Sequence, residues 1–260
     1  MLRSYLSLAV AMLATIQQVA SQCQEVITQE NFNLDEYKSA KWYVQQQIPN
    51  PFQPVNLNFC VNAEYSELDP SNIWSSASGY DLKVFNTAQD AEGNVYTSDD
   101  QTQFGPAVGP LCGAQAAFLG DNASKLTVGI CDIPISSDGK SNYWVVAYDE
   151  EEGYALVSGG QTDKPTSDGL CAYTSPFLGL WIFSRCPERN DEMIGKYRAI
   201  AKAHGIDPSV MNDVSQEGCE MDKQTKKQCK GMVRRKKDKK SKKDKKSKKD
   251  TKSKKGNKRI

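Results

Sequence analysis

The stretch NYWVVAYDEEEGYALVSG, residues 142–159, indicates the fold class of this chain. Residues 143–149 and 154–159 are rich in the β-branched and aromatic residues that suit β-strands. A short acidic segment that ends in Gly153 separates the two runs and is typical of a turn. The stretch therefore predicts two antiparallel strands joined by a hairpin turn.

Six more runs of the same kind occur along the chain, with Gly, Pro, Asn and Asp between them. They cover residues 42–48, 59–65, 81–86, 114–119, 125–133 and 180–185. Segments 90–94 and 120–124 are typical of hairpin loops. Eight short strands joined by tight turns predict an all-β fold with one helix, in which an antiparallel up-and-down barrel of eight strands forms the body. A β-sandwich is the alternative that this pattern allows.

One helix is expected after the last strand. Pro187 ends that strand, Asn190 suits the N-cap, and Gly205 suits the left-handed residue that follows a helix. Apolar residues recur between them at helical spacing, which predicts a C-terminal helix packed on the barrel wall by one stripe. His204, the only histidine, falls at the end of this helix, where a structural role is expected rather than catalysis.

The N-terminus and the cysteines predict a secreted protein. Residues 1–21 combine Arg3, an apolar run too short to span a bilayer and small residues at 19–21, the pattern of a signal peptide. No other segment is predicted to cross a membrane. The eight cysteines form no CxxC motif, which favours disulfides over a zinc site. Asn122 begins a sequon and is predicted to be glycosylated.

Charge is divided unevenly along the chain, although the formal net charge is only +1. Residues 1–233 hold 16 Lys and Arg against 29 Asp and Glu, whereas residues 234–260 hold 17 against 3. A Lys-rich segment with almost no apolar residue cannot form a core, so residues 223–260 are expected to be a disordered tail. Residues 22–222 remain as one folded domain.

Three segments resemble, in order, the conserved blocks of the lipocalin family. NFNLDEYKSAKWYVQQQIPNPF at 31–52 is similar to the block that opens the first strand, and residues 142–159 are similar to the second block. LWIFSRCP at 180–187 resembles the third, which ends in an arginine. The closing segment AKAHGIDPSVMNDVSQEGC, residues 201–219, is also similar to the end of apolipoprotein D and its bacterial and plant relatives.

The resemblance implies a plug at the closed end of the barrel. Trp42 opens the first strand there, and Arg185 can stack on its indole, a cation–π contact of about 1–2 kcal/mol. The role predicted for both residues is structural. The chain departs from the family at Ala40, where a glycine is usual, and in the long segment 96–110, which leaves open whether these residues form a lid.

Strand alternation predicts which side chains face the interior. If Arg185 points inward, the residues two and four positions earlier do so too. The predicted lining is Val61, Ala63, Tyr65, Leu82, Val84, Trp181 and Phe183. These residues form an apolar cup, and the resemblance implies that it binds and carries a small lipophilic ligand such as a fatty acid, sterol, bilin or carotenoid. A structural or matrix protein with a solidly filled barrel is the alternative.

Catalysis is disfavoured by the residue content. The chain has no Gly-x-Ser-x-Gly motif and no phosphate-binding glycine motif. The enzymatic alternative is the violaxanthin de-epoxidase family, which acts on epoxy-carotenoids and whose barrel entry is similar to residues 41–52. Opening an epoxide needs a carboxylic acid, and residues 53–59 contain none. We therefore expect a binding protein, not an enzyme, without a cofactor or a metal.

The resemblance implies two disulfides, Cys60–Cys219 and Cys23–Cys171. A third is predicted from spacing alone, because Cys112 and Cys131 are equidistant from the turn centre at 121–122 and would lie directly opposite each other in a symmetric hairpin. Cys186 and Cys229 remain, and the sequence leaves open whether they pair or stay free.

The cationic tail predicts a polyanionic partner outside the cell. A Lys-rich segment can act as a nuclear localisation signal, but a protein with a signal peptide is secreted and does not enter the nucleus. Nucleic acid is therefore not expected as the partner of the tail. A dense positive charge binds polyanions by releasing their counterions, without needing shape. Residues 234–260 are therefore predicted to tether the protein to extracellular polysaccharide, anionic lipid or a mineral surface. A solubilising tail that folds back on the acidic body is the alternative.

Overall fold

The computed structural model of the protein describes residues 23–69, 78–100, 109–115, 123–135 and 141–235. Several predictions fall outside these residues. They are the signal peptide, the glycosylation of Asn122, most of the possible lid at 96–110 and the tail from residue 236 onward.

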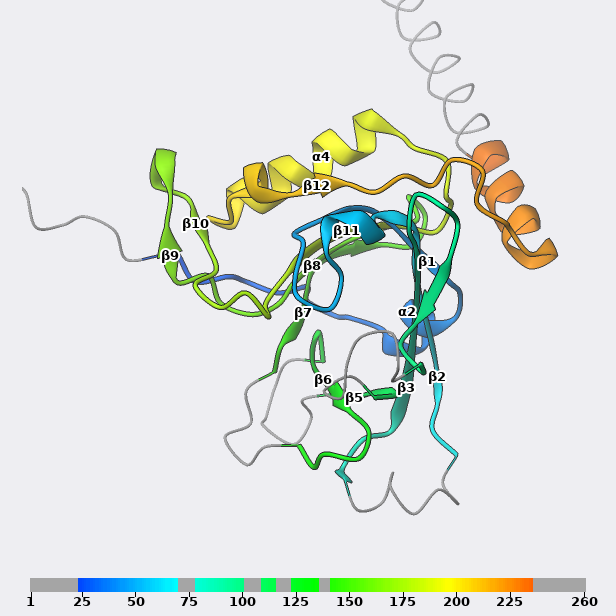
Figure 1. Cartoon of the computed structure of the whole chain (residues 1–260). Helices are drawn as coiled ribbons and strands as arrows, with labels where there is room; N and C mark the ends of the chain where they lie inside the picture. Colours follow the sequence, from blue (N-terminus) through cyan, green and yellow to red (C-terminus); the bar gives the residue numbers. More distant parts are fainter. Residues whose placement is uncertain (1–22, 70–77, 101–108, 116–122, 136–140, 236–260) are drawn as a thin grey trace, which may run out of the picture.

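Eight strands close into one antiparallel barrel (Figure 1). They are β1 (Trp42–Gln47), β2 (Phe59–Glu67), β3 (Leu82–Gln89), β5 (Leu111–Gln115), β6 (Lys125–Ile130), β7 (Tyr143–Asp149), β8 (Tyr154–Ser158) and β11 (Leu180–Ser184). Each strand pairs with the next one along the chain, and β11 pairs back with β1. The predicted fold class, a lipocalin-type barrel with a C-terminal helix, is therefore confirmed.

Several shorter helices and strands lie outside the eight barrel strands. They are α2 (Leu34–Lys38), η2 (Val55–Leu57), β4 (Val95–Thr97), β9 (Lys164–Pro165), η4 (Ser167–Gly169), β10 (Cys171–Ala172), η5 (Pro208–Val210) and β12 (Asn212–Asp213). β4 pairs with β3, β12 pairs with β1, and β9 and β10 form a separate ribbon. Among the described helices, none has the length and apolar character needed to cross a membrane.

The predicted C-terminal helix is α4 (Asp191–Ala203). The Asn190 side chain accepts a hydrogen bond from the Met193 N–H at its start, and Gly205, with φ +72°, follows its end. The buried face of α4 packs on the outward side chains of β8 and β11, so the helix lies across the outer wall (Figure 1). His204 is the C-cap, and burial lowers the pKa of its imidazole.

The β5–β6 hairpin differs from the predicted register. Cys112 lies opposite Gly129 and not opposite Cys131, so the pairing is shifted by two residues. The two cysteines are diagonal neighbours whose Cα atoms lie 4.8 Å apart, a separation that a disulfide can bridge. The expected pair therefore forms, but the symmetric hairpin from which it was predicted is wrong.

Four disulfides join the chain. They are Cys23–Cys171, Cys60–Cys219, Cys112–Cys131 and Cys186–Cys229. The first three are the predicted pairs, and the fourth pairs the two cysteines that the sequence left open. The sulfurs of the fourth disulfide lie close to the carboxylate of Glu188. Because these sulfurs are bonded to each other, they are not available as thiolate ligands for a metal.

The folded part of the chain continues beyond the expected boundary at residue 222. Residues 223–235, here called the C-terminal segment, are helical, whereas disorder was expected. Asp222 begins the helix, because its carboxylate accepts hydrogen bonds from the Thr225 N–H at 2.7 Å and from the Thr225 hydroxyl at 2.9 Å. The segment lies at the edge of the barrel, separated in the view from β5 and β6 (orange in Figure 1).

Candidate functional site

A buried cation and a buried indole occupy one end of the barrel interior. The guanidinium carbon of Arg185 lies 3.7 Å from the centre of the Trp42 ring, and both side chains are fully buried. Trp42 opens β1 and Arg185 follows β11, so the pairing of these two strands brings the residues together. The stacking that the sequence predicts is therefore present.

Arg185 also joins separate parts of the chain by hydrogen bonds. Its guanidinium donates to the backbone carbonyls of Glu36 and Tyr37 at 2.9 and 3.0 Å, and to that of Ala40. Its Nε donates to Glu150, in the turn between β7 and β8, at 3.0 Å. Because Ala40 contributes only its carbonyl, the departure from the usual glycine leaves this contact intact.

The residues predicted to line the cup face the barrel interior. The buried ones are Val61, Ala63, Leu82, Val84 and Phe183, and the partly buried ones are Tyr65 and Trp181. All except Val84 belong to one apolar cluster. Val84 shares the face of β3 with Leu82, while Lys83 between them points outward and pairs with Asp99.

The alternation is clearest on β11. Trp181 and Phe183 belong to the interior cluster. Leu180 and Ile182 belong instead to the cluster beneath α4. This strand therefore separates the cup from the helix-covered wall, and it holds Arg185 inward at the end of the same face.

A cluster of three tyrosine hydroxyls lies inside the barrel next to the plug. The Tyr143 hydroxyl oxygen is 2.7 Å from that of Tyr37 and 2.7 Å from that of Tyr65. The three side chains come from α2, β2 and β7. Burial raises the pKa of each hydroxyl, that of Tyr65 to about 12. All three therefore stay protonated at neutral pH and can donate as well as accept hydrogen bonds.

Gln47 places a polar atom without a partner in the interior. A bulge between Val44 and Gln46 shifts the alternation of β1, so that Gln47 lies opposite Trp181 and shares its face. Its amide nitrogen donates to the Asn58 side chain at 2.8 Å. Its oxygen is buried and accepts no hydrogen bond from the described residues. A buried acceptor without a hydrogen bond lowers the stability of a fold by about 1–3 kcal/mol. A hydrogen-bond donor on a bound molecule would offset this loss.

A groove lies outside the barrel, beside the start of α4. This groove has a volume of about 960 Å³ and is lined mainly by residues 187–191 and 212–219. Four carboxylates, those of Glu188, Asp191, Asp213 and Glu217, lie along it. Sites for small apolar molecules are mostly apolar and concave. Because four carboxylates lie along the groove while one apolar cluster lines the barrel interior, we take the interior as the candidate site for such a molecule.

Comparison with solved structures finds several chains with low sequence identity to this one. Apocrustacyanin C1 is 18% identical over 76% of this chain and 91% of its own, with a TM-score of 0.48. Lobster apocrustacyanin A1 is 17% identical over 76% and 90%, with a TM-score of 0.47. The cockroach allergen Per a 4 is 16% identical over 78% and 96%, with a TM-score of 0.43. No protein-family model and no curated protein match the chain.

Proposed function

We propose that the protein is a secreted lipocalin of the apolipoprotein D kind that carries a small hydrophobic molecule in its barrel. One observation carries the proposal. Tyr65 and Trp181 belong to the interior cluster, and burial raises the pKa of Tyr65 to about 12, yet both residues are only partly buried. We expect this combination of depth and partial exposure from residues on the wall of an internal cup, and more complete burial of both in a solidly packed barrel.

The lining suggests the chemistry of the ligand. Transfer of apolar ligand surface into the cup contributes about 25 cal/mol per Å². The oxygen of Gln47 and the hydroxyl of Tyr65 add two polar positions. Arg185 is already engaged with Glu150 and three carbonyls, so it offers no free partner to an anionic head group. We therefore expect a neutral ligand with a hydroxyl group, a sterol or hydroxylated carotenoid in preference to a fatty acid.

The disulfides support the extracellular part of the proposal. Four disulfides join the described chain, and such bonds persist in oxidising compartments and are rare in the cytosol. Cys60–Cys219 and Cys23–Cys171 are also the pairs that the resemblance to apolipoprotein D implies.

Native mass spectrometry of the delipidated protein tests the proposal. The protein would be incubated separately with a sterol, a hydroxylated carotenoid, a bilin and a fatty acid. We expect a one-to-one complex with at least one hydroxyl-bearing ligand and a weaker one with the fatty acid. No complex with any of the four would contradict the proposal and favour the filled structural barrel. Turnover of an epoxy-carotenoid in the presence of ascorbate would favour the enzymatic alternative.

A further inference from the structure

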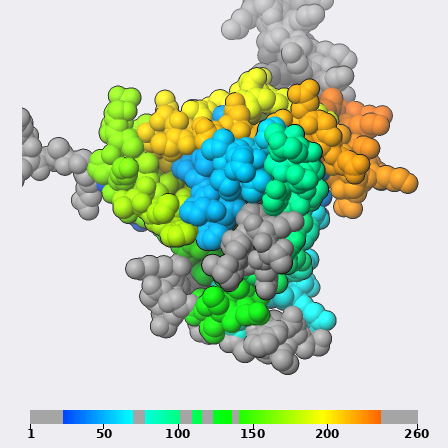
Figure 2. Space-filling model, in the orientation of Figure 1, coloured from blue at the N-terminus to red at the C-terminus, as the bar shows by residue number. Residues whose placement is uncertain are grey.

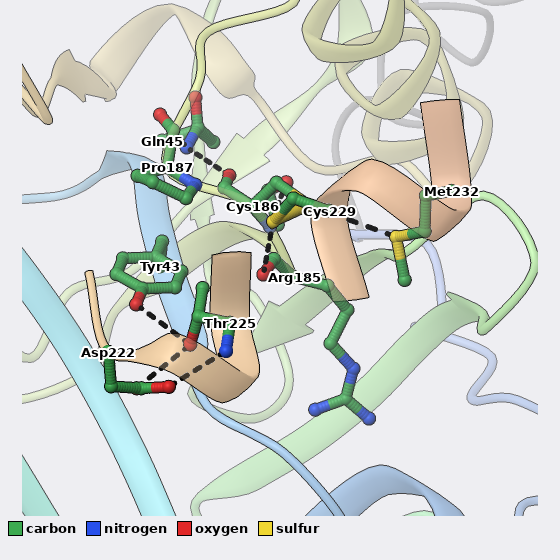
Figure 3. The surroundings of a disulfide bond; sticks show 10 residues. Tyr43, Gln45, Arg185, Cys186, Pro187, Asp222, Thr225, Cys229 and Met232 are labelled. Atoms are coloured by element: carbon green, nitrogen blue, oxygen red, sulfur yellow. Dashed lines mark hydrogen bonds between the residues drawn. A yellow bond between two sulfur atoms is a disulfide. The ribbon is translucent and has the colours of Figure 1, made fainter. Parts of the chain in front are cut away.

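The C-terminal segment is held against the barrel at three successive turns (Figure 3). The Tyr43 hydroxyl donates to the Thr225 hydroxyl oxygen at 3.4 Å. The disulfide Cys186–Cys229 joins the segment covalently to the residue that follows Arg185. Met232 is buried, and its Sδ lies 3.9 Å from the Cys186 Sγ. The orientation of this helix relative to the barrel is therefore fixed.

The opposite face of the segment is cationic. The buried residues Thr225, Cys229 and Met232 follow each other at spacings of four and three, so they form one stripe along the helix. A second stripe, with the same helical spacing on the opposite side, consists of Lys223, Lys227, Lys230 and Arg234, which are all exposed. At 1.5 Å per residue, this cationic stripe is about 16 Å long.

The cations of this stripe are available to a partner. None of the four side chains forms an ion pair with a described carboxylate. Lys226 and Arg235, also exposed, flank the stripe. The sequence then continues from 236 to 260 with 15 more Lys and Arg against 3 Asp. In the space-filling view the segment stands at the periphery of the molecule (Figure 2).

We propose that the cationic stripe of the C-terminal segment binds a linear sulfated polysaccharide. The stripe presents positive charge along a line, which suits a chain of anions. Disulfides are typical of proteins outside the cytosol, where such polysaccharides, and not nucleic acids, are the abundant polyanions. Membrane helices use an apolar face for insertion. Here the buried stripe faces the barrel, and Val233 is the one exposed large apolar residue among 223–235.

Binding of this kind has a characteristic salt dependence. Each cation that neutralises an anion of the polymer releases a condensed counterion, so the logarithm of the affinity falls linearly with the logarithm of the salt concentration. Replacing a contacting lysine lowers the magnitude of that slope by about one. The slope therefore counts the contacts that a given set of lysines makes.

Heparin binding by two full-length double variants tests the assignment. Lys227→Gln with Lys230→Gln removes two charges from the stripe. Lys164→Gln with Lys202→Gln removes two exposed charges elsewhere, on β9 and α4, and is the matched control. We expect the stripe variant to bind heparin more weakly than the control, with a salt slope smaller in magnitude by about two. All four positions are exposed, so the thermal midpoint should stay unchanged in both variants.

Three outcomes would overturn the proposal. Equal losses in the two variants would show that only total charge matters and that the helix is not the binding surface. Unchanged heparin affinity in the stripe variant would leave no role for the C-terminal segment. Tighter binding to phosphatidylserine vesicles than to heparin at equal salt would assign the surface to a membrane. None of these outcomes bears on ligand binding in the barrel, which is tested separately.

Discussion

At the scale of single residues, the closed end of the barrel depends on Arg185. Replacement by alanine would remove the stacking on Trp42 together with the hydrogen bonds that Arg185 donates to Glu150 and to three backbone carbonyls. We expect Arg185→Ala to lower the free energy of unfolding by about 1–3 kcal/mol, because the cation–π contact and several buried hydrogen bonds are lost while Glu150 stays partly exposed to water. Urea denaturation of the variant and the wild type measures this difference.

Arg185→Lys is the control for this prediction. It keeps the positive charge but loses the planar fork that reaches several carbonyls at once, so its stability should lie between those of the wild type and the alanine variant. Ligand affinity of the folded Arg185→Lys protein should change little. An alanine variant with wild-type stability but no ligand binding would contradict the structural role.

The same scale shows what the sequence could and could not reveal. Period-two alternation was enough to place Trp181 and Phe183 inward, because β11 has regular pairing along its length. It could not find Gln47, because the bulge in β1 changes the face of every residue after it. Tyr37 lies on a short helix ahead of β1, where strand alternation says nothing about its direction.

At the scale of elements, Gly153 tests the contact between the β7–β8 turn and the C-terminal segment. Its φ is +70°, and a Cβ there would lie 2.8 Å from the Met232 Sδ. Gly93 has a similar φ of +85° but no atom within 4 Å of its Cβ position. Gly93→Ala should cost about 1–2 kcal/mol from the left-handed backbone alone. We expect Gly153→Ala to cost more, and the urea midpoints of the two variants measure the excess.

The difference in stability loss between Gly153→Ala and Gly93→Ala measures the contact between the β7–β8 turn and Met232. In a double-mutant cycle, Gly153→Ala should cost less in the Met232→Ala background than in the wild type, because the smaller side chain leaves room for the new Cβ. If Gly153→Ala and Gly93→Ala lower the free energy of unfolding equally, Met232 does not contact the β7–β8 turn in solution.

Two helices show why one element was predicted and the other was not. α4 has a capping asparagine, a closing glycine and a regular apolar stripe in its own sequence. The C-terminal segment has only Thr225, Cys229 and Met232 on its buried face, within a Lys-rich stretch. It is held largely by a disulfide to Cys186, which lies 43 residues away in sequence, and local composition carries no sign of such a bond.

At the scale of the whole molecule, the two proposed binding surfaces are separate. The ligand would lie among side chains enclosed by the barrel strands, while the polysaccharide would lie along the outer face of the C-terminal segment (Figure 2). The Arg185 plug and the disulfide that follows it stand between them. A tethered protein could therefore keep its barrel open to exchange ligand.

The overall topology could be read from the sequence because it is local. Each of the barrel strands pairs with its neighbour in chain order, so turns and alternation suffice to predict a meander. Register is less local, since Cys112 lies opposite Gly129 and not opposite Cys131. The tyrosine cluster is the least local, since it joins Tyr37, Tyr65 and Tyr143 only after the barrel has closed.

The most direct test of ligand binding inside the barrel is the quenching of tryptophan emission in two matched variants. Trp181 belongs to the interior cluster, whereas Trp144 packs with the outer cluster, where the Lys125 ammonium lies 3.9 Å above its ring. The delipidated protein would be titrated with the ligand found by mass spectrometry. We predict saturable quenching that Trp181→Phe strongly reduces and Trp144→Phe leaves intact. Quenching that survives in Trp181→Phe and disappears in Trp144→Phe would place the ligand on the outer wall and contradict the account.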